Sequence, residues 1–298
     1  MRCCRTSSCH SKECDAGVRG RAARGKVESR HLSAFSCTKR GQEGVQHLVS
    51  LESNEFGIVA PLFEGHRLKR IDIDATLEGV TGSVIVDNAQ SPDAARIQSG
   101  GYSLFGGDSR LSESEELLRK CSRSIVVEDK RWEERMIQVQ GDRIGKFVRH
   151  EFRSDPLDPD HLQEMRSRLP KDYIIQELDT DLTGRAVNDI GEICLGAFGT
   201  PQDQARSAPG FCVLKGDLVV SAATSAVACS YGIDIQITTH PGYRRLGLAT
   251  SVSAALILRC MEISMEPHWS AANDWSAELA RKLGYVEDFS FVQYYLKF

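Results

Sequence analysis

Hydrophobic and polar residues alternate in one segment of the chain and then change to a helical spacing. Three isoleucines alternate with Asp234 and Gln236 over residues 233–237, so one face of this strand is apolar and the other is polar. From residue 249 to residue 263, apolar side chains recur every three or four positions, which predicts a buried helix. The connecting residues 240–246 contain Pro, Gly and two Arg, which indicates a loop.

The surrounding segments predict further strands and helices. Two strands joined by tight turns to the strand at 233–239 complete an antiparallel meander. The aromatic-rich C-terminal segment predicts two short strands within 285–298. The other expected elements are helices at 161–169, 183–195 and 275–283, and strands at 173–178, 211–214, 218–229 and 267–272.

The first half of the chain predicts a separate α/β unit. Strand-like runs between residues 82 and 105 end at Asn, Pro or Gly, and the spacing of Ser112 and Glu115 predicts a capping box that opens a helix at 112–121. Two prolines within 154–159 indicate a boundary. We therefore expect three parts: a tail at 1–52, an N-terminal α/β domain at 53–160 and a second domain at 161–298.

The tail has its own composition. The first 50 residues carry ten Lys or Arg against four Asp or Glu and few large aliphatic side chains, which predicts a disordered basic segment. An organelle transit peptide is an alternative interpretation of an Arg-rich, acid-poor head. A cluster of four cysteines and one histidine at its start lacks the paired spacing of a zinc site, so we expect no metal; these residues are Cys3, Cys4, Cys9, His10 and Cys14.

Composition and charge exclude several classes of protein. The 298 residues are 41% hydrophobic and 26% charged, as in globular proteins, which excludes a disordered or fibrous chain. The net charge of −4 argues against a protein built mainly to bind nucleic acid. Isolated cysteines beyond the tail predict buried, reduced thiols. Neither a membrane-spanning run nor the apolar core of a secretory signal is present, so we expect a cytoplasmic protein.

The loop before the long helix has the chemistry of an anion site. Unpaired backbone N–H groups and the positive end of the helix dipole face whatever lies at a helix N-terminus. Gly247 permits close approach of a ligand to the backbone, and Arg244 and Arg245 add positive charge. The alternative is that the glycine only begins the helix and the arginines are solvated. The Walker and dinucleotide glycine patterns are both missing, which disfavours ATP and NAD.

Two sequence blocks, in this order of elements, resemble the GNAT acyltransferase family. The block THPGYRRLGLAT at 239–250 looks like the family's acetyl-CoA loop, and residues 273–285 follow as N-x-x-S-x-x-L-A-x-K-L-G-Y. Residues 79–108 resemble the front half of the subgroup that contains zwittermicin-type self-resistance acetyltransferases. The resemblance implies an α/β protein with the GNAT fold, a mixed and mostly antiparallel sheet flanked by helices. We interpret the N-terminal α/β domain as a candidate degenerate copy of it.

The resemblance also implies where acetyl-CoA binds. Loop amides would hold the pyrophosphate, the strand edge would pair with the pantetheine arm, and a backbone N–H near Ile237 would stabilise the oxyanion. Asn273 would lie beside the coenzyme, with a helix cap as the alternative role. The expected coenzyme-binding residues are Ile237, Thr238, Thr239, Arg244, Arg245, Leu246, Gly247, Leu248, Ala249, Thr250 and Asn273.

Transfer to an amine requires a base, because an ammonium has no lone pair. Asp234 lies on the polar face of its strand, where related sequences often carry Glu, and we expect it to act through a water; an exposed, non-catalytic carboxylate is the alternative. Ala280 occupies the position of the tyrosine that often serves the family as general acid, so Tyr285, Ser276 or water is the expected substitute.

These implications lead to one main functional hypothesis and two others. The main one is an acetyl-CoA-dependent N-acetyltransferase that acetylates a primary amine of a small molecule directly, with no metal, nucleic acid or membrane among its partners. The missing tyrosine at Ala280 favours an alternative, a coenzyme A-binding sensor or regulatory module that has lost catalysis. Nucleic-acid binding by the basic tail is a third hypothesis, which depends on the tail alone.

Overall fold

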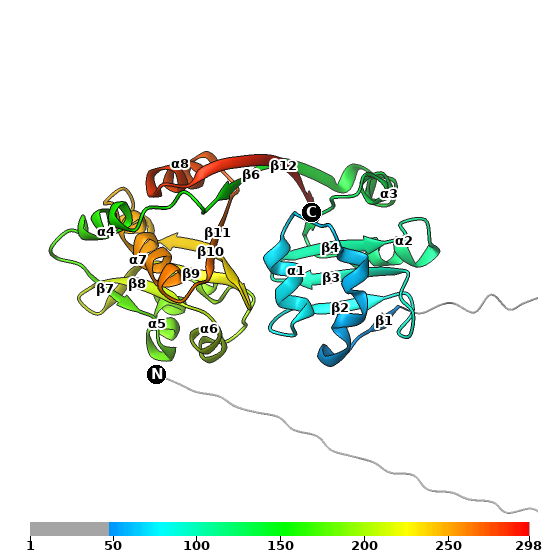
Figure 1. Cartoon of the computed structure of the whole chain (residues 1–298), viewed down its shortest axis with the longest axis horizontal. Coiled ribbons are helices and arrows are strands. Elements are labelled where there is room, and N and C mark those ends of the chain that lie inside the picture. The colour runs from blue at the N-terminus through cyan, green and yellow to red at the C-terminus, as the bar shows by residue number, and fades with distance from the viewer. Residues whose placement is uncertain (1–47, 298) are drawn as a thin grey trace, which may run out of the picture. The chain divides into compact units, whose positions relative to one another are not determined.

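One mixed sheet organises residues 48–297, the part of the chain that the structure, a computed structural model, describes (Figure 1). Its twelve strands follow the order β1-β2-β3-β4-β5-β12-β6-β11-β10-β9-β8-β7. Neighbouring strands are antiparallel, except that β4 is parallel to β5 and β10 is parallel to β11, which confirms the expected mixed and mostly antiparallel sheet. The strands are β1 (Val49–Ser50), β2 (Ser83–Val86), β3 (Ala94–Ser99), β4 (Tyr102–Gly107), β5 (Ser124–Val126), β6 (Ile144–Arg153), β7 (Ile174–Glu177), β8 (Gly210–Lys215), β9 (Leu218–Cys229), β10 (Gly232–Thr239), β11 (Glu266–Ala271) and β12 (Val286–Leu296).

Helices of both halves pack against this sheet. In the second half, α7 packs against β8, β9 and β10, with α4 and α8 beside it, and α5 packs against β9. In the first half, α1 packs against β3 and also reaches β9 and β10. The helices are η1 (Ser53–Phe63), α1 (Arg70–Leu77), α2 (Ser112–Arg119), α3 (Lys130–Gln140), η2 (Gly141–Arg143), α4 (Pro159–Ser167), α5 (Thr180–Ile190), η3 (Glu192–Leu195), α6 (Pro201–Ser207), η4 (Pro241–Tyr243), α7 (Leu248–Glu262) and α8 (Asp274–Leu283).

The two halves repeat one order of elements. The first half contains β4-α2-β5-α3-β6, and the second contains β10-α7-β11-α8-β12, each with a parallel pair of strands joined through a helix. Their last strands are exchanged: β12 pairs with β5 of the first half, and β6 pairs with β11 of the second. Figure 1 shows β6 and β12 running together between the halves, and they pair along their length. This arrangement supports the interpretation of the N-terminal part as a copy.

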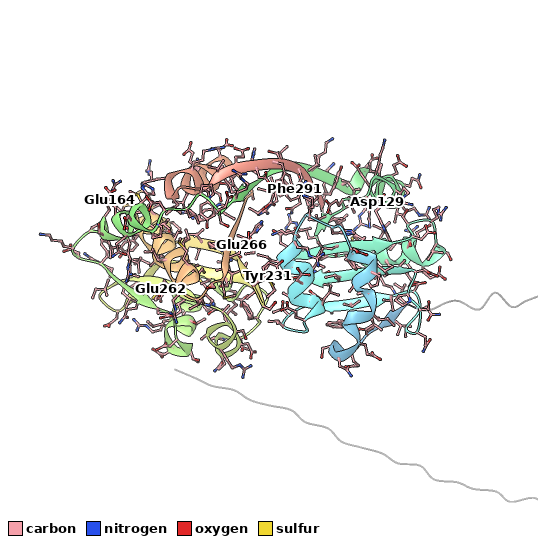
Figure 2. The ribbon with its side chains drawn as sticks, in the orientation of Figure 1. Asp129, Glu164, Tyr231, Glu262, Glu266 and Phe291 are labelled. Atoms are coloured by element: carbon pink, nitrogen blue, oxygen red, sulfur yellow. The ribbon has the colours of Figure 1, made fainter. Side chains whose placement is uncertain are left out.

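Contacts between α1 and the turn after β9 add to the exchanged strands. The Tyr231 hydroxyl donates to Asp74 at 2.8 Å, and the Ser230 hydroxyl donates to Glu78 at 2.6 Å. Figure 2 shows Tyr231 next to α1. These bonds hold the middle and the C-terminal end of α1 against the second half, and the helix also contacts β10.

The helix α7 is buried more widely than its sequence pattern predicts. Val252, Leu256 and Cys260 form the expected stripe and pack with β8 and β9. Ala254 and Ile257, on another side, pack with Trp269 and the helices α4 and α8 in a second cluster. Truncation of a fully buried side chain such as Leu256 to Ala is expected to cost about 2–5 kcal/mol.

Several predicted elements differ from those observed. The C-terminal segment forms the one strand β12, because a register shift between Glu287 and Phe289 lets pairing with β6 continue. The helix predicted at 183–195 is interrupted at Gly191, whose φ of 111° ends α5 before the short helix η3. The capping box at Ser112 is wrong: Leu111 is the N-cap, and the Ser112 hydroxyl instead bonds to Glu113. The sequence pattern did not predict β1, η1, α1, β5, α3, η2, β6, α6 or η4.

Other expectations concern the tail and the domain boundary. Residues 1–47 of the predicted tail, with its Cys and His residues, lie outside the described residues, whereas β1 falls within 48–52. The boundary near residue 160 stays a prediction; the parts on either side of it share the sheet.

Cys121, Cys194, Cys212, Cys229 and Cys260 are free thiols, all buried except the half-buried Cys121. Within residues 48–297, the helices are too short or too polar to cross a membrane.

Candidate active site

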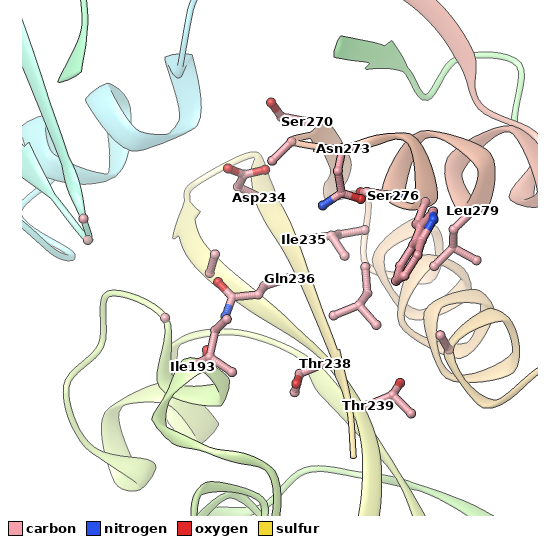
Figure 3. A pocket seen from close by; sticks show the side chains of 18 of the residues that line it. Ile193, Asp234, Ile235, Gln236, Thr238, Thr239, Ser270, Asn273, Ser276 and Leu279 are labelled. Atoms are coloured by element: carbon pink, nitrogen blue, oxygen red, sulfur yellow. Dashed lines mark hydrogen bonds between the residues drawn. The ribbon is translucent and has the colours of Figure 1, made fainter. Parts of the chain in front are cut away.

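A cleft of about 1870 Å³ opens where two parallel strands separate. β10 pairs with β11 only at Gly232, Ile233 and Asp234, and the side of β10 that faces β11 is free beyond this point. On its other side, β10 stays paired with β9 to its end at Thr239. Figure 3 shows Asp234 and Ser270 at one end of the cleft and Thr238 and Thr239 toward the other. The free strand edge can pair with an extended ligand.

The loop between β10 and α7 presents unpaired amides to this cleft. The backbone N–H groups of residues 244–250 donate no hydrogen bond to any acceptor in the described part of the chain. The helix begins at Leu248, and Gly247 is its N-cap with a left-handed φ of 81°. A Cβ atom built at Gly247 would meet no atom within 4 Å, so the space above this residue is open. This geometry suits an anionic ligand.

Ten of the eleven expected coenzyme residues line the cleft, and Leu246 does not. Arg244 donates from Nε to the Thr239 carbonyl at 3.3 Å, which ties the loop to the end of β10. Asn273 has the predicted cap role, since its Oδ1 accepts from the Ser276 backbone N–H at 3.0 Å, and it also lines the cleft. Its two roles are therefore compatible.

Asp234 lies at the inner end of the cleft and is only 6% exposed, so its interpretation as an exposed carboxylate is wrong. The polar face of β10 is covered there by the start of α1, which the sequence analysis did not predict. Lys69 Nζ donates to Asp234 Oδ2 at 2.5 Å, and His268 Nδ1 lies 3.2 Å from Oδ1. Although burial opposes the effect, these two partners hold the pKa of Asp234 well below its usual range.

His268 links Asp234 to a second carboxylate. Its Nε2 lies 2.8 Å from Glu151 Oε2, so the imidazole lies between two carboxylates. Burial lowers the pKa of His268, but the contacts with Asp234 and Glu151 outweigh this effect and raise the pKa to about 10. Glu151 also accepts from the Ser270 hydroxyl at 2.6 Å, and Arg149 donates from Nε to the same hydroxyl at 2.9 Å. The result is a buried polar network on β6, β10 and β11.

The first half of the chain contributes to the same network. Lys69, the N-cap of α1, has a left-handed φ of 57°, and its Nζ lies 3.6 Å from Asp72 Oδ2 and 4.3 Å from the centre of the Tyr102 ring. Despite burial, Asp234, Tyr102 and Asp72 raise the pKa of Lys69 above its ordinary value. Lys69, Asp72, Tyr102 and Arg149 all line the cleft. None of the four was identified from sequence as a site residue: Lys69, Asp72 and Arg149 lie outside the stretches that resemble the family, and Tyr102 was expected only as part of a strand.

The structure does not bring Tyr285 to the cleft. Its side chain is 3% exposed, packs on Trp269, and its hydroxyl donates to the Pro267 carbonyl at 2.7 Å. Burial raises its pKa well above the ordinary value. Ala280 is buried as well. Of the expected side-chain acids, only Ser276 lines the cleft, where its hydroxyl accepts from the Trp269 indole N–H at 3.2 Å.

Comparison with known proteins identifies similar sequences and structures. The model of the GNAT acetyltransferase family matches residues 60–294. An uncharacterized N-acetyltransferase of Bacillus subtilis, YdfB, is 25% identical over 228 residues, which cover 72% of this chain and 86% of the relative. A GCN5-related N-acetyltransferase-like protein from Streptococcus suis is 28% identical, with a TM-score of 0.72, covering 82% of this chain and 99% of that one.

A more distant solved structure shares the fold. A tandem GNAT protein from the clavulanic acid biosynthesis pathway aligns with a TM-score of 0.56 at 12% identity, over 83% of this chain and 97% of that one. This likeness concerns the fold alone. Together these matches confirm the expected fold, while the finer resemblance to the zwittermicin-resistance subgroup stays a prediction.

Proposed function

Because the chain belongs to the GNAT acetyltransferase family, we propose that it transfers the acetyl group of acetyl-CoA to a primary amine of a small molecule. The observation that carries this proposal is the composition of the cleft of about 1870 Å³. Its outer part has the unpaired amides of residues 244–250, and its inner part has the charged side chains of Lys69, Asp72 and Asp234. A phosphate-binding turn and ionisable groups at a reacting centre thus lie in one cavity.

The residues present fit acetyl-CoA. The loop amides and the open space at Gly247 suit a pyrophosphate, with Arg244 and Arg245 nearby. The free edge of β10 from Ile235 to Thr239 suits the amide-containing pantetheine arm, which can pair as an added strand. A backbone N–H on this edge near Ile237 would then stabilise the oxyanion of the tetrahedral intermediate, by analogy worth about 3–4 kcal/mol.

The acceptor end of the cleft supports a small molecule rather than a long chain. Residues of both halves surround it: Lys69, Gln98 and Tyr102 come from the first half, and Ile193 and Gln236 come from the second. The ionisable groups gathered there favour catalysis over the alternative of a sensor that only binds coenzyme A. Cytoplasmic location and the absence of nucleic-acid and membrane partners remain predictions.

The test is a thiol-release assay with acetyl-CoA against amino acids, polyamines and aminated antibiotics, with mass spectrometry of the products. We expect one class of amines to gain an acetyl group in proportion to the thiol released. Calorimetric binding of acetyl-CoA without acetylation of any amine in the panel would instead support the sensor. Failure to bind acetyl-CoA would contradict both functions.

A further inference from the structure

We propose that Asp72, from the first half of the chain, binds the amino group of the acceptor and takes its proton during acetyl transfer. This inference rests on the proposed function and adds to it a residue outside both sequence blocks that resemble the family. It also assigns the acceptor to a chemical class, a primary amine that enters the cleft as an ammonium ion.

Asp234 already has partners for both of its carboxylate oxygens. Oδ2 accepts from Lys69 at 2.5 Å, and Oδ1 lies 3.2 Å from His268 Nδ1. These contacts stabilise the ionised form, so the carboxylate has a low affinity for a proton. A substrate ammonium would have to compete with two resident cations. Asp234 is therefore better suited to hold Lys69 and His268 in place.

Asp72 also lines the cleft, but, unlike Asp234, it has a carboxylate oxygen that makes no hydrogen bond within residues 48–297. It is 3% exposed, the Ser99 hydroxyl beside it favours its ionised form, and its Oδ2 is the oxygen that makes no hydrogen bond among the described residues. The Lys69 ammonium lies 3.6 Å away and is directed to Asp234 instead. A buried carboxylate oxygen without a donor is unfavourable, so a donor from a ligand would stabilise it. Burial also raises the pKa of Asp72, which moves this carboxyl toward the proton affinity of an effective base.

The arrangement of charges also favours this role of Asp72. Carboxylates and cations alternate along one line, in the order Asp72, Lys69, Asp234, His268 and Glu151. This line has three carboxylates and two cations, and Arg149 adds a third positive charge beside its Glu151 end. Its Glu151 end accepts from Ser270, which Arg149 holds, whereas its Asp72 end faces the cleft. A substrate ammonium at Asp72 would complete the alternation.

The groups around Asp72 come from every element that packs near it, and they leave Asp72 as the group that changes charge. They are Lys69 on its own helix, Ser99 on β3, Tyr102 on β4, Arg149 on β6, Asp234 on β10 and His268 on β11. The pKa of Lys69 and the pKa of His268 are both raised, and the pKa of Asp234 is lowered, so all three stay charged near neutral pH. The protonation of Asp72 is then the step that follows amine binding.

The reaction balances with this assignment. The ammonium gives one proton to Asp72, and the freed nitrogen lone pair forms a bond to the thioester carbonyl carbon while the carbonyl π electrons move to oxygen. The C–S bond then breaks, sulfur takes its electron pair, and the second nitrogen proton reaches sulfur through water. Asp72 finally releases its proton to solvent. The net products are the acetylated amine, the free thiol of coenzyme A and one proton.

The test uses the full chain and two probe amines, ethanolamine, which is an ammonium at neutral pH, and methoxylamine, which is uncharged there. Asp72→Asn is expected to lower kcat/KM for ethanolamine by about 100-fold, with a much smaller loss for methoxylamine, which needs no proton removed before attack. The acidic limb of the ethanolamine pH profile should disappear, and the affinity for acetyl-CoA measured by calorimetry should not change. Asp72→Ser is a second variant with the same expected pattern.

Asp74→Asn is the matched control, because it makes the same change on the same helix, where Asp74 contacts Arg70 and Tyr231 and does not line the cleft. It should keep the ethanolamine rate. If Asp72→Asn and Asp72→Ser keep both the rate and the acidic limb while Asp234→Asn loses them, the inference is overturned and the proposed function stands. A wild-type protein that acetylates neither probe, nor any amine of the larger panel, would overturn both.

Discussion

Asp234 and His268 contact each other through their side chains at the last position where β10 and β11 pair, with 3.2 Å between Oδ1 and Nδ1. Directly beyond this pair the two strands separate and the cleft begins. The contact therefore lies at the end of the paired part of the sheet, where Asp234 lines the cleft and His268 lines a second, smaller pocket. Because both side chains are largely buried, their charges affect the stability of the fold as well as the site.

We first predict that His268 makes the stability of the protein depend on pH. Its pKa is raised from 6.5 to about 10 in the folded protein, so its contribution to stability is fully present below pH 6.5. That contribution is lost as the pH rises from 6.5 toward 10, because the unfolded chain loses this proton first. The total is on the order of a few kcal/mol. His268→Gln should therefore lower Tm most at pH 6, and the difference in Tm from wild type should shrink by pH 9.

The difference between the two proteins is the quantity to measure, because the buried cysteines also titrate in the unfolded chain and contribute equally to both. His161→Gln is the control for the loss of an imidazole outside the network, since His161 bonds to the Lys282 carbonyl. A His268→Gln difference that stays constant from pH 6 to pH 9 would contradict the charged state assigned to His268.

The sequence predicted the parts of this site that are local and failed for those that are not. The alternating isoleucines, the glycine loop and the helix after it follow one another in the chain, so their periodicities identify the segment that carries ten of the coenzyme-binding candidates. Lys69 lies 165 positions before Asp234 in the sequence, and its contact with that residue depends on how α1 packs across the halves. No periodicity or motif encodes such a contact.

Tyr285 is the converse case, a residue that the sequence predicted in the site and that lies outside the cleft. It belongs to a sequence block that resembles the family, and this proximity suggested a role in the site. The left-handed Gly284, with a φ of 105°, ends α8 and turns the chain so that the tyrosine packs beneath Trp269. Backbone geometry at one glycine thus decides whether the hydroxyl faces the ligand or the protein core.

We predict from this position that Tyr285→Phe lowers stability and leaves catalysis intact. The change removes the donor to the buried Pro267 carbonyl, which should cost about 1–3 kcal/mol in the free energy of unfolding. Turnover per folded molecule should equal that of wild type at a temperature where both are folded. Urea unfolding and the thiol-release assay measure the two quantities. A tenfold loss of kcat with a normal KM would restore Tyr285 as the general acid.

Trp275 is predicted to report acetyl-CoA binding through its fluorescence. It is 79% exposed and lines the cleft, whereas Trp132 and Trp269 are buried. A ligand that covers Trp275 should shift its emission to shorter wavelength or quench it, and the titration should give the same Kd as calorimetry. Trp275→Phe should abolish the signal while calorimetry still detects binding. If the emission change persists in Trp275→Phe, the ligand does not cover this side chain.

The last prediction concerns Gly247 and separates charge from backbone strain. Gly247 has a φ of 81°, so any side chain there strains the backbone, by roughly 1 kcal/mol for residues that tolerate this conformation. Asn and Asp both tolerate it and have nearly the same size. Gly247→Asn and Gly247→Asp should therefore lose similar stability in thermal unfolding.

Their affinities for acetyl-CoA should differ, because only the carboxylate repels a pyrophosphate at the unpaired amides of the loop. We expect Gly247→Asp to bind at least about tenfold more weakly than Gly247→Asn, a difference of about 1.4 kcal/mol or more. Arg244→Ala should weaken binding less than Gly247→Asp, since it keeps the amides. Calorimetric titration at low salt and at high salt gives the comparison, and screening should reduce the Asp–Asn difference. Equal affinities of the two Gly247 variants at low salt would mean that the phosphates lie elsewhere, and the acetyl-CoA assignment would lose the site on which it depends.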